Sequence, residues 1–245
     1  MIVILSPHFD DAVLSCWSVL TGPADVEVLN VFTGAPARPT DLTEAELLTG
    51  ADDALARARE RADEDRAALA VAGVRARNVG LLDHPHWAAG RRLARWRTGH
   101  RLRELREAIG RHLDRRARLY VPAALGGHPD HVLVRELGCR LLRDGGSVSF
   151  YADQPYCYVY GWPHWVTGGE RDPNLDLERD WRRHLDTASS SFSELRPEVV
   201  RLGDAHERKL EALRLYRTQF AVLEGGANRR VSNPELTGWE LFWHS

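Results

Sequence analysis

The stretch MIVILSPHFDD, residues 1–11, sets the fold that we expect for this chain. Residues 2–5 form a short, continuous apolar run, which is typical of a strand buried on both faces in a parallel sheet. Residues 11–20 then suit a helix, and residues 26–32 (VEVLNVF) form a second apolar strand. Strand, helix and strand within about thirty residues make a βαβ unit.

The same alternation continues along the chain. In chain order, the further predicted elements are a helix over 52–72 that ends at Gly73, a strand at 77–82, an amphipathic helix with apolar residues from 102 to 113, a strand at 119–122, a helix with apolar residues from 134 to 141, and a strand at 148–152. This alternation predicts an α/β fold, Rossmann-like, with a mostly parallel, doubly wound sheet and helices on both faces.

The C-terminal third is less regular. Residues 156–196 are rich in Trp, Tyr, Gly, Pro and Ser, and predict long loops with one short helix at 179–187. A last helix is predicted over 206–220, before a tail that ends in the apolar segment 239–243. Because the chain has no internal repeat and no low-complexity linker, we expect a single domain over 1–245 with an irregular, substrate-side insertion around 156–196.

Composition excludes several classes of function. The 245 residues carry a net charge of -2, so there is no field of one sign to attract nucleic acid or an anionic membrane surface. The N-terminal apolar run is too short for a signal peptide, and we expect a cytoplasmic protein. Its three cysteines are widely spaced, which favours reduced, buried thiols: Cys16, Cys139 and Cys157.

Two polar clusters follow predicted strands. One is SPHFDD at 6–11, and the other is GGHPDH at 126–131, shortly after the strand at 119–122. In open parallel sheets, ligands bind outside the carboxyl ends of the strands. A dinucleotide site is excluded at the first cluster because no glycine lies between Met1 and Thr21.

The residue types in these clusters favour a metal site. Imidazole and carboxylate suit zinc, and a catalytic zinc keeps three protein ligands and an open position for water. His8, one aspartate of the adjacent pair and a histidine of the second cluster would complete such a set, leaving the spare aspartate as a general base. Two simpler interpretations stay open: Asp10 or Asp11 could cap the first helix, and His128 to His131 could be a polar loop. The pairing of both clusters at strand ends favours the metal site.

The two motifs resemble the signatures of the PIG-L or LmbE-like N-deacetylases. Three weaker features agree: the spacing from Arg61 to Glu64 and Ala68, the LLD sequence at 81–83, and the segment 209–219. Residues 160–200 are unmatched. The resemblance implies a zinc-dependent hydrolase that removes an N-acetyl or other N-acyl group from an amino sugar or amino-sugar conjugate, with natural-product biosynthesis as one setting.

The resemblance also implies a role for each site residue. His8, Asp11 and His131 would bind one Zn²⁺ per chain, with Fe²⁺ as the alternative metal. The remaining implied roles are a general base at Asp10, an oxyanion stabiliser or amine-protonating acid at His128, an orienting carboxylate at Asp130, and substrate contacts at Arg61 and Asp83. For Arg61 a surface charge in a salt-bridged helix is the alternative. The sequence departs from the family at Ala12, where glutamate is frequent, and at Gly126, where some sugar deacetylases carry a tyrosine.

An aromatic cluster in the insertion offers a platform for a sugar ring or a larger aglycone. Its members are Tyr151, Tyr156, Tyr158, Tyr160, Trp162 and Trp165, and we expect Trp162 or Trp165 to stack against substrate. A strand edge packed into the core is the alternative. His84 and His86 are interpreted as surface or loop residues.

Three hypotheses of function follow. The first is the amino-sugar deacetylase, and the second is an amidase of the same mechanism that acts on a non-sugar or thiol-conjugate amide. The third is a non-catalytic metal-binding or partner-binding module. The expected partner is a small N-acylated molecule, with neither nucleic acid nor membrane, and the sequence is compatible with a homo-oligomer.

Overall fold

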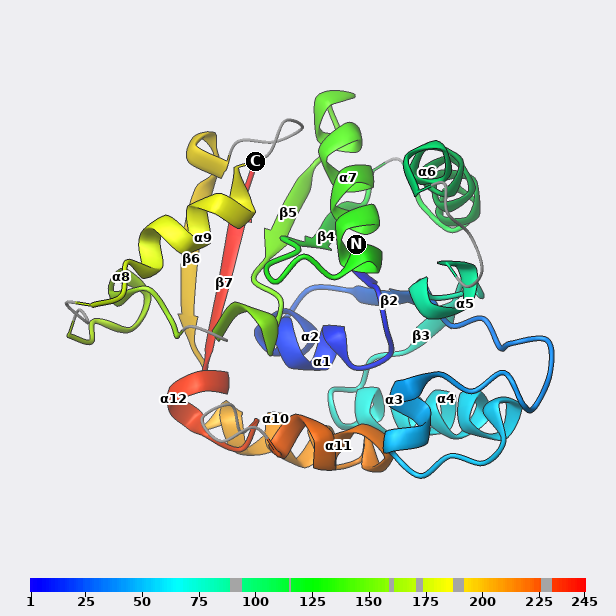
Figure 1. The fold of residues 1–245 in the computed structure, drawn as a ribbon. Helices are drawn as coiled ribbons and strands as arrows, with labels where there is room; N and C mark the ends of the chain where they lie inside the picture. The colour runs from blue at the N-terminus through cyan, green and yellow to red at the C-terminus, as the bar shows by residue number, and fades with distance from the viewer. Residues whose placement is uncertain (89–93, 115, 159–160, 171–173, 187–191, 226–230) are drawn as a thin grey trace.

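A computed structural model describes residues 1–88, 94–114, 116–158, 161–170, 174–186, 192–225 and 231–245. Within them the strands form a seven-stranded sheet in the order β3-β2-β1-β4-β5-β7-β6 (Figure 1). In chain order these strands are β1 (Ile2–Ser6), β2 (Val26–Asn30), β3 (Ala76–Asn78), β4 (Arg118–Pro122), β5 (Val148–Tyr151), β6 (Arg196–Arg201) and β7 (Trp239–His244). The strands from β1 to β5 pair in parallel, which confirms the predicted mostly parallel α/β sheet.

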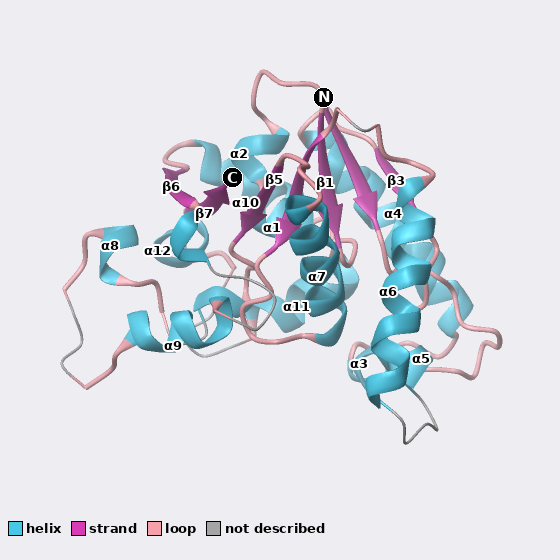
Figure 2. Ribbon diagram, turned by 90° about the horizontal axis from the view of Figure 1, so that it is seen from above, coloured by secondary structure: helices cyan, strands magenta, loops and turns pink. Residues whose placement is uncertain are grey.

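Helices cover both faces of the sheet (Figures 1 and 2). The described helices are α1 (Asp11–Ser15), α2 (Trp17–Leu20), α3 (Glu44–Leu48), α4 (Ala54–Val71), α5 (His84–Ala88), α6 (Ala94–Gly110), α7 (Pro129–Arg143), α8 (His164–Thr167), α9 (Leu177–Leu185), α10 (Ala205–Leu213), α11 (Arg217–Glu224) and α12 (Pro234–Thr237). Helices α6 and α7 pack against each other on one face, whereas α10 contacts both α1 and α4 on the other. None of these helices is both long and apolar enough to cross a bilayer.

Strand β1 is central and sets the position of the first polar cluster. Ile4 pairs with Val28 of β2 on one side and with Tyr120 of β4 on the other. The side chains of Val3, Ile4 and Leu5 are fully buried, as the continuous apolar run predicts. Because β1 and β4 are parallel neighbours, the residues that follow them meet at one edge of the sheet.

The C-terminal segment departs from the expectation of a tail. Residues 239–244 form β7, an antiparallel strand that lies between β5 and β6, with Phe150 opposite Trp243 and Val199 opposite Leu241. Strand β6, at 196–201, has mostly exposed side chains and carries no apolar signal in the sequence. The formation of strand β6 therefore depends on its pairing with β7 and not on a local sequence pattern.

Two predicted helices are each interrupted, although neither contains glycine or proline. The helix expected over 11–20 breaks at Cys16, where the carboxylate of Glu240 accepts hydrogen bonds from the backbone N–H groups of Trp17 (2.6 Å) and Ser18 (2.9 Å). The helix expected over 206–220 divides into α10 and α11 around Tyr216. At the second break the carboxylate of Glu64 accepts the backbone N–H of Thr218 (3.0 Å). In both places a carboxylate from a distant part of the chain thus satisfies a backbone N–H at the start of the second helix.

The insertion contributes to the core. Trp162 and Trp181 are buried, with ring centroids 5.5 Å apart, and Trp181 lies 6.3 Å from Trp243 of β7. The short helix expected at 179–187 is α9, and residue 187 itself lies outside the described residues. These aromatic side chains belong to the same apolar cluster as the buried residues of α6 and α7.

Candidate active site

The two polar clusters meet at the predicted edge of the sheet. The ring centroid of His8 lies 4.9 Å from that of His128 and 5.3 Å from that of His131. Each of the three histidines offers a ring nitrogen, and these nitrogens all lie within 4.8 Å of one another. The fold thus brings the turn after β1 and the start of α7 into one site.

The two adjacent aspartates have different surroundings. Asp11 is the first residue of α1, is 3% exposed, and accepts a hydrogen bond from the backbone N–H of His8 (2.7 Å). Its Oδ2 lies 3.4 Å from Nδ1 of His8 and 3.3 Å from Nε2 of His131. Asp10 occupies the N-cap position, but its side chain makes no capping hydrogen bond. The helix-cap interpretation of Asp10 therefore has no support in the structure.

His131 presents a nitrogen suited to a metal ion. Its Nδ1 lies 2.6 Å from Oδ1 of Asp153, and both side chains are fully buried. Its Nε2 is buried and makes no hydrogen bond within the described part of the chain. The hydrogen bond from Nδ1 to Asp153 places the proton of the neutral His131 ring on Nδ1. The lone pair of Nε2 is then directed toward Asp11, as in the carboxylate–histidine–metal arrangement. A buried imidazole nitrogen that faces a carboxylate oxygen fits the divalent ion that the motifs predict.

Sequence reasoning missed Asp153. It follows β5, at the same edge of the sheet as the two motifs, and also accepts a hydrogen bond from the backbone N–H of Leu125 (3.1 Å). Its position directly after a predicted parallel strand was the signal that could have identified it.

Asp130 lies where the resemblance implies an orienting carboxylate. It is fully buried, and its Oδ2 lies 3.2 Å from Nε2 of His8. The same oxygen accepts the backbone N–H of His84 (2.9 Å), and Oδ1 accepts the indole N–H of Trp87 (3.3 Å). Asp130 thereby ties α5 to the site and holds one edge of the His8 ring.

Helix α5 is held in place by hydrogen bonds of His86 that the sequence does not suggest. Nδ1 of His86 lies 2.5 Å from Oδ1 of Asp83, and its Nε2 lies 3.0 Å from the backbone oxygen of Asp41. His86 is therefore half-buried and hydrogen-bonded, and its interpretation as a surface or loop residue is wrong. Asp83 is paired with His86, and its predicted contact with substrate stays a prediction.

The electrostatics of the site separate its histidines. Burial, together with the nearby rings of His8 and His131, lowers the pKa of His128 to about 4. Although burial opposes it, the carboxylates of Asp11 and Asp130 raise the pKa of His8 to about 9. His128 is thus neutral near pH 7. Because its Nδ1 accepts the backbone N–H of Asp130 (3.3 Å), its proton is on Nε2, where it can be donated.

Asp10 and Arg61 act on each other. Burial and the charge of Asp11 raise the pKa of Asp10, while the positive charge of Arg61 opposes this rise. The guanidinium carbon of Arg61 lies 5.7 Å from the ring centroid of Phe9, so the side chain packs over the residue that precedes Asp10. This position disfavours the alternative of a surface charge in a salt-bridged helix.

Tyr156, a member of the predicted aromatic platform, lies beside two histidines of the site. Its ring centroid lies 5.2 Å from that of His131 and 6.1 Å from that of His128. Gly126 has a φ of 88°, and a Cβ at this position would come within 2.9 Å of Cβ of Tyr156. Burial and the negative charges of Asp11 and Asp10 raise the pKa of Tyr156 well above its ordinary value, so its hydroxyl keeps its proton.

Of the two tryptophans expected to stack against substrate, Trp162 is buried and Trp165 is exposed. Trp162 is 7% exposed, donates its indole N–H to the backbone oxygen of Leu236 (2.7 Å), and packs in the core, so it is not available to stack on substrate. Trp165 is 42% exposed. Tyr160, another member of the predicted aromatic platform, lies outside the described residues.

The family model of the PIG-L proteins, described as GlcNAc-PI de-N-acetylase, matches residues 3–142. The chain belongs to the PIG-L family. The match spans both motifs and ends within α7, before Asp153, Tyr156 and the last strands. As a member of the PIG-L family, the protein is an enzyme of the N-deacetylase class.

Solved structures of deacetylases share the fold over nearly the whole chain. The deacetylase of the A40926 pseudoaglycone, an antimicrobial compound, has 24% sequence identity and a TM-score of 0.68, and the match covers 99% of this chain and 96% of that chain. A deacetylase of the teicoplanin biosynthetic pathway, solved as a complex, has 24% identity and a TM-score of 0.72 with the same coverage. The zinc-inhibited form of a teicoplanin deacetylase has 23% identity, a TM-score of 0.69, and coverage of 99% and 97%. Among curated proteins, none matches the chain.

Proposed function

We propose that this PIG-L family member is a zinc-dependent deacetylase that hydrolyses the N-acyl group of an amino-sugar conjugate, with one ion per chain bound by His8, Asp11 and His131. The observation that carries the proposal is the buried Nε2 of His131, which has no hydrogen-bond partner among the described residues and lies 3.3 Å from Asp11. Two nitrogens and one carboxylate oxygen are a common ligand set of catalytic zinc. Fe²⁺ is the alternative metal.

The proposed reaction is the attack of water on the acyl carbonyl carbon, followed by departure of the amine. When bound, the zinc ion supplies Lewis acidity, which polarises the carbonyl and makes the attacking water more acidic. Asp10 accepts the proton of that water and returns it to the nitrogen as the carbon–nitrogen bond breaks and the amine departs. Burial beside Asp11 raises its pKa and so makes it a stronger base. Arg61 balances part of the charge that this carboxylate carries.

His128 is proposed to stabilise the negative charge that develops on the carbonyl oxygen. Its neutral ring offers an Nε2–H donor, and its pKa of about 4 favours this role over that of an acid carrying a proton before the reaction starts. Asp130 and Asp153 hold the rings of His8 and His131 in place, so these histidines keep their orientation through the reaction.

The proposed substrate is a bulky N-acylated glycoconjugate of the kind found in glycopeptide antibiotics. The solved structures of the A40926 pseudoaglycone deacetylase and of a deacetylase in the teicoplanin biosynthetic pathway each match 99% of this chain, including the insertion that the family model does not match. Loops at the ligand-binding edge of a rigid sheet are where substrate preference varies within a fold. The exposed Trp165 and the site-facing Tyr156 come from this region.

A substrate panel with metal analysis tests the proposal. The purified protein, loaded with Zn²⁺ or with Fe²⁺, is incubated with an N-acylated glycopeptide, with N-acetylglucosamine, and with an N-acetylated thiol conjugate, and the released acids are measured by mass spectrometry. We expect the glycopeptide to be hydrolysed fastest, with loss of both metal and activity in His131→Ala. Hydrolysis of the thiol conjugate alone would identify the non-sugar amidase, and hydrolysis of none with either metal would contradict the proposal. Full metal occupancy in His131→Ala would show that the ligand set is different, with His128 as the next histidine to test.

A further inference from the structure

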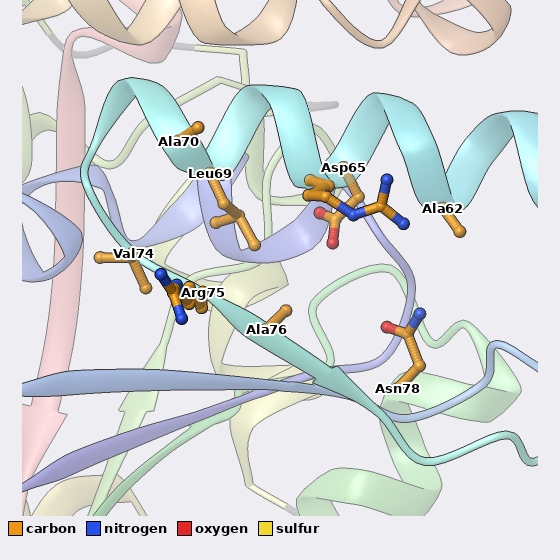
Figure 3. A pocket seen from close by; sticks show the side chains of 9 residues that line it. Ala62, Asp65, Leu69, Ala70, Val74, Arg75, Ala76 and Asn78 are labelled. Atoms are coloured by element: carbon orange, nitrogen blue, oxygen red, sulfur yellow. The ribbon is translucent and has the colours of Figure 1, made fainter.

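A buried carboxyl group that the proposed reaction does not use lies behind the turn that carries Asp10. Asp65 is on α4 and is 2% exposed. Figure 3 shows its side chain directed from α4 toward the sheet, on the same side as Asn78 of β3. It lines a cavity of about 360 Å³ between α4 and β3, so solvent can exchange protons with it.

The hydroxyl of Tyr216 connects Asp65 to this turn. Its oxygen lies 2.8 Å from Oδ1 of Asp65 and 3.0 Å from the backbone oxygen of Phe9, and Tyr216 is buried. A phenol has one proton and can donate only one full hydrogen bond, whereas the carbonyl of Phe9 has no proton to give. Both contacts are hydrogen bonds at the same time only if Asp65 carries a proton and donates it to the oxygen of Tyr216.

We propose that Asp65 is a positioning residue that works in its neutral form: it donates a hydrogen bond to Tyr216, which donates to the carbonyl of Phe9 and so fixes the backbone that precedes Asp10. This relay of two hydrogen bonds, from Asp65 to Tyr216 and from Tyr216 to Phe9, connects α4 through the break between α10 and α11 to the turn after β1. Because it positions the proposed general base, this inference rests on the proposed function.

The groups that face Asp65 favour the neutral form on balance. Burial raises its pKa to about 7, the negative charge of Asp10 adds to this rise, and the hydrogen bonds from Tyr216 and Asn30 and the charge of Arg61 act in the opposite direction. Nδ2 of Asn30 lies 2.6 Å from Oδ2. Arg66 and Arg75 line the cavity on the solvent side. Asp65 thus changes its charge near neutral pH.

Loss of the proton has a defined structural consequence. An ionised Asp65 accepts the single proton of Tyr216, because a hydrogen bond to a charged acceptor is the stronger one. The carbonyl of Phe9 then loses its hydrogen bond from Tyr216, and the backbone next to Asp10 is freed. We therefore expect kcat to fall as the pH rises through about 7, with little change in KM.

Asp65→Asn is the decisive variant. An asparagine accepts from Asn30 with its oxygen and donates to Tyr216 with its amide group at every pH, so it copies the neutral acid. We expect it to keep kcat within about twofold of the wild type at pH 6 and to lose the decline above pH 7. Tyr216→Phe, which breaks the relay, should lower kcat about tenfold at all pH values with KM unchanged. Equal loss in Asp65→Asn and Asp65→Ala, with the alkaline decline retained, would overturn the proposal.

Two measurements without substrate keep this test separate from that of the proposed function. Carbon NMR of the Asp65 carboxyl group should give a pKa near 7, and a value near the ordinary 4 would overturn the proposal. Because the folded-state pKa is raised, the group's contribution to stability is lost as the pH rises from about 4 to about 7. The Tm of the wild type relative to Asp65→Asn should therefore fall over that range. If the wild type hydrolysed no N-acyl substrate, the proposed function would fail, and these two measurements would still decide the state of Asp65.

Discussion

The N-terminal part of the molecule, up to α7, and the part from β5 onward contribute to the candidate site in different ways. The first part carries both histidine–aspartate motifs, in the segments that follow the parallel strands β1 and β4, and is the part that the family model matches, at residues 3–142. The second part carries no motif of its own. It supplies Asp153 behind His131, Tyr156 beside the histidines, and Glu240 on β7, which anchors α2.

This difference separates two kinds of contribution. Residues that carry out the chemistry are concentrated in short motifs, because the reaction fixes both their type and their spacing. Residues that hold those motifs in place come from any segment that packs against them, so they leave no local pattern in the sequence. Substitutions in the two parts should therefore differ in whether they affect catalysis, metal binding or stability.

The first prediction concerns the two aspartates of the N-terminal motif. Asp10→Asn should lower kcat by about 10²–10⁴-fold yet leave metal content unchanged, since it removes the proposed general base alone. Asp11→Asn should lose metal and activity together, because Asp11 lies within 3.4 Å of a nitrogen of each of two histidines. Steady-state kinetics and metal analysis measure both effects. Equal metal loss in the two variants would make Asp10 a ligand.

The second prediction concerns the ion pair between α10 and β7. Nζ of Lys209 lies 3.5 Å from Oε1 of Glu240, both side chains are fully buried, and burial lowers the pKa of Lys209. Lys209→Met leaves the buried carboxylate of Glu240 without its counter-charge and should lower the free energy of unfolding by about 3–5 kcal/mol. Urea denaturation followed by circular dichroism measures this loss.

An exposed ion pair serves as the control for burial, and kcat shows whether the buried pair also affects catalysis. Arg106→Met removes an exposed ion pair with Asp144, and its effect on unfolding should stay within about 1 kcal/mol. Where Lys209→Met remains folded, kcat should match that of the wild type. A specific loss of kcat at full stability would place this pair in the catalytic machinery and break the division between the two parts.

The third prediction tests the support that the C-terminal part gives to the metal site. Asp153→Asn should weaken metal binding about 10–100-fold, because the carboxylate no longer holds the Nδ1 proton of His131. Competition with a chelator measures the affinity. Asp144→Asn, a change at an exposed carboxylate, serves as the control and should bind metal as tightly as the wild type. Unchanged affinity in Asp153→Asn would show that packing alone orients His131.

The fourth prediction concerns the two tryptophans of the insertion and has the smallest expected effect on the folded protein. Trp165→Ala should change stability by less than about 0.5 kcal/mol and should raise KM for a bulky substrate more than for N-acetylglucosamine. Trp162→Ala is the matched comparison, and loss of its buried ring should cost about 3–5 kcal/mol of stability. If Trp165→Ala left KM unchanged for every substrate, substrate would bind away from α8.

The parallel half of the fold and most of the candidate site could be predicted from the sequence. The apolar runs at 2–5 and 119–122 identify buried strands, and the rule that ligands bind at the carboxyl ends of parallel strands predicts that His8 lies near His131. The fold confirms that proximity. The sequence alone did not distinguish the surroundings of Asp10 from those of Asp11, because both residues occupy the same turn.

What only the tertiary structure decided lies in the long-range contacts. Local propensity would continue the helices that break at Cys16 and Tyr216. The breaks arise because the carboxylates of Glu240 and Glu64, both distant in sequence, accept backbone N–H groups at the start of the following helices. Strand β6 exists because β7 pairs with it. Periodicity and motif spacing act over a few residues, so they determine strands, helices and ligand types. Hydrogen bonds between distant segments depend on how the chain packs, and therefore the helix breaks, the supporting carboxylate of Asp153 and the place of Tyr156 were fixed only in the folded protein.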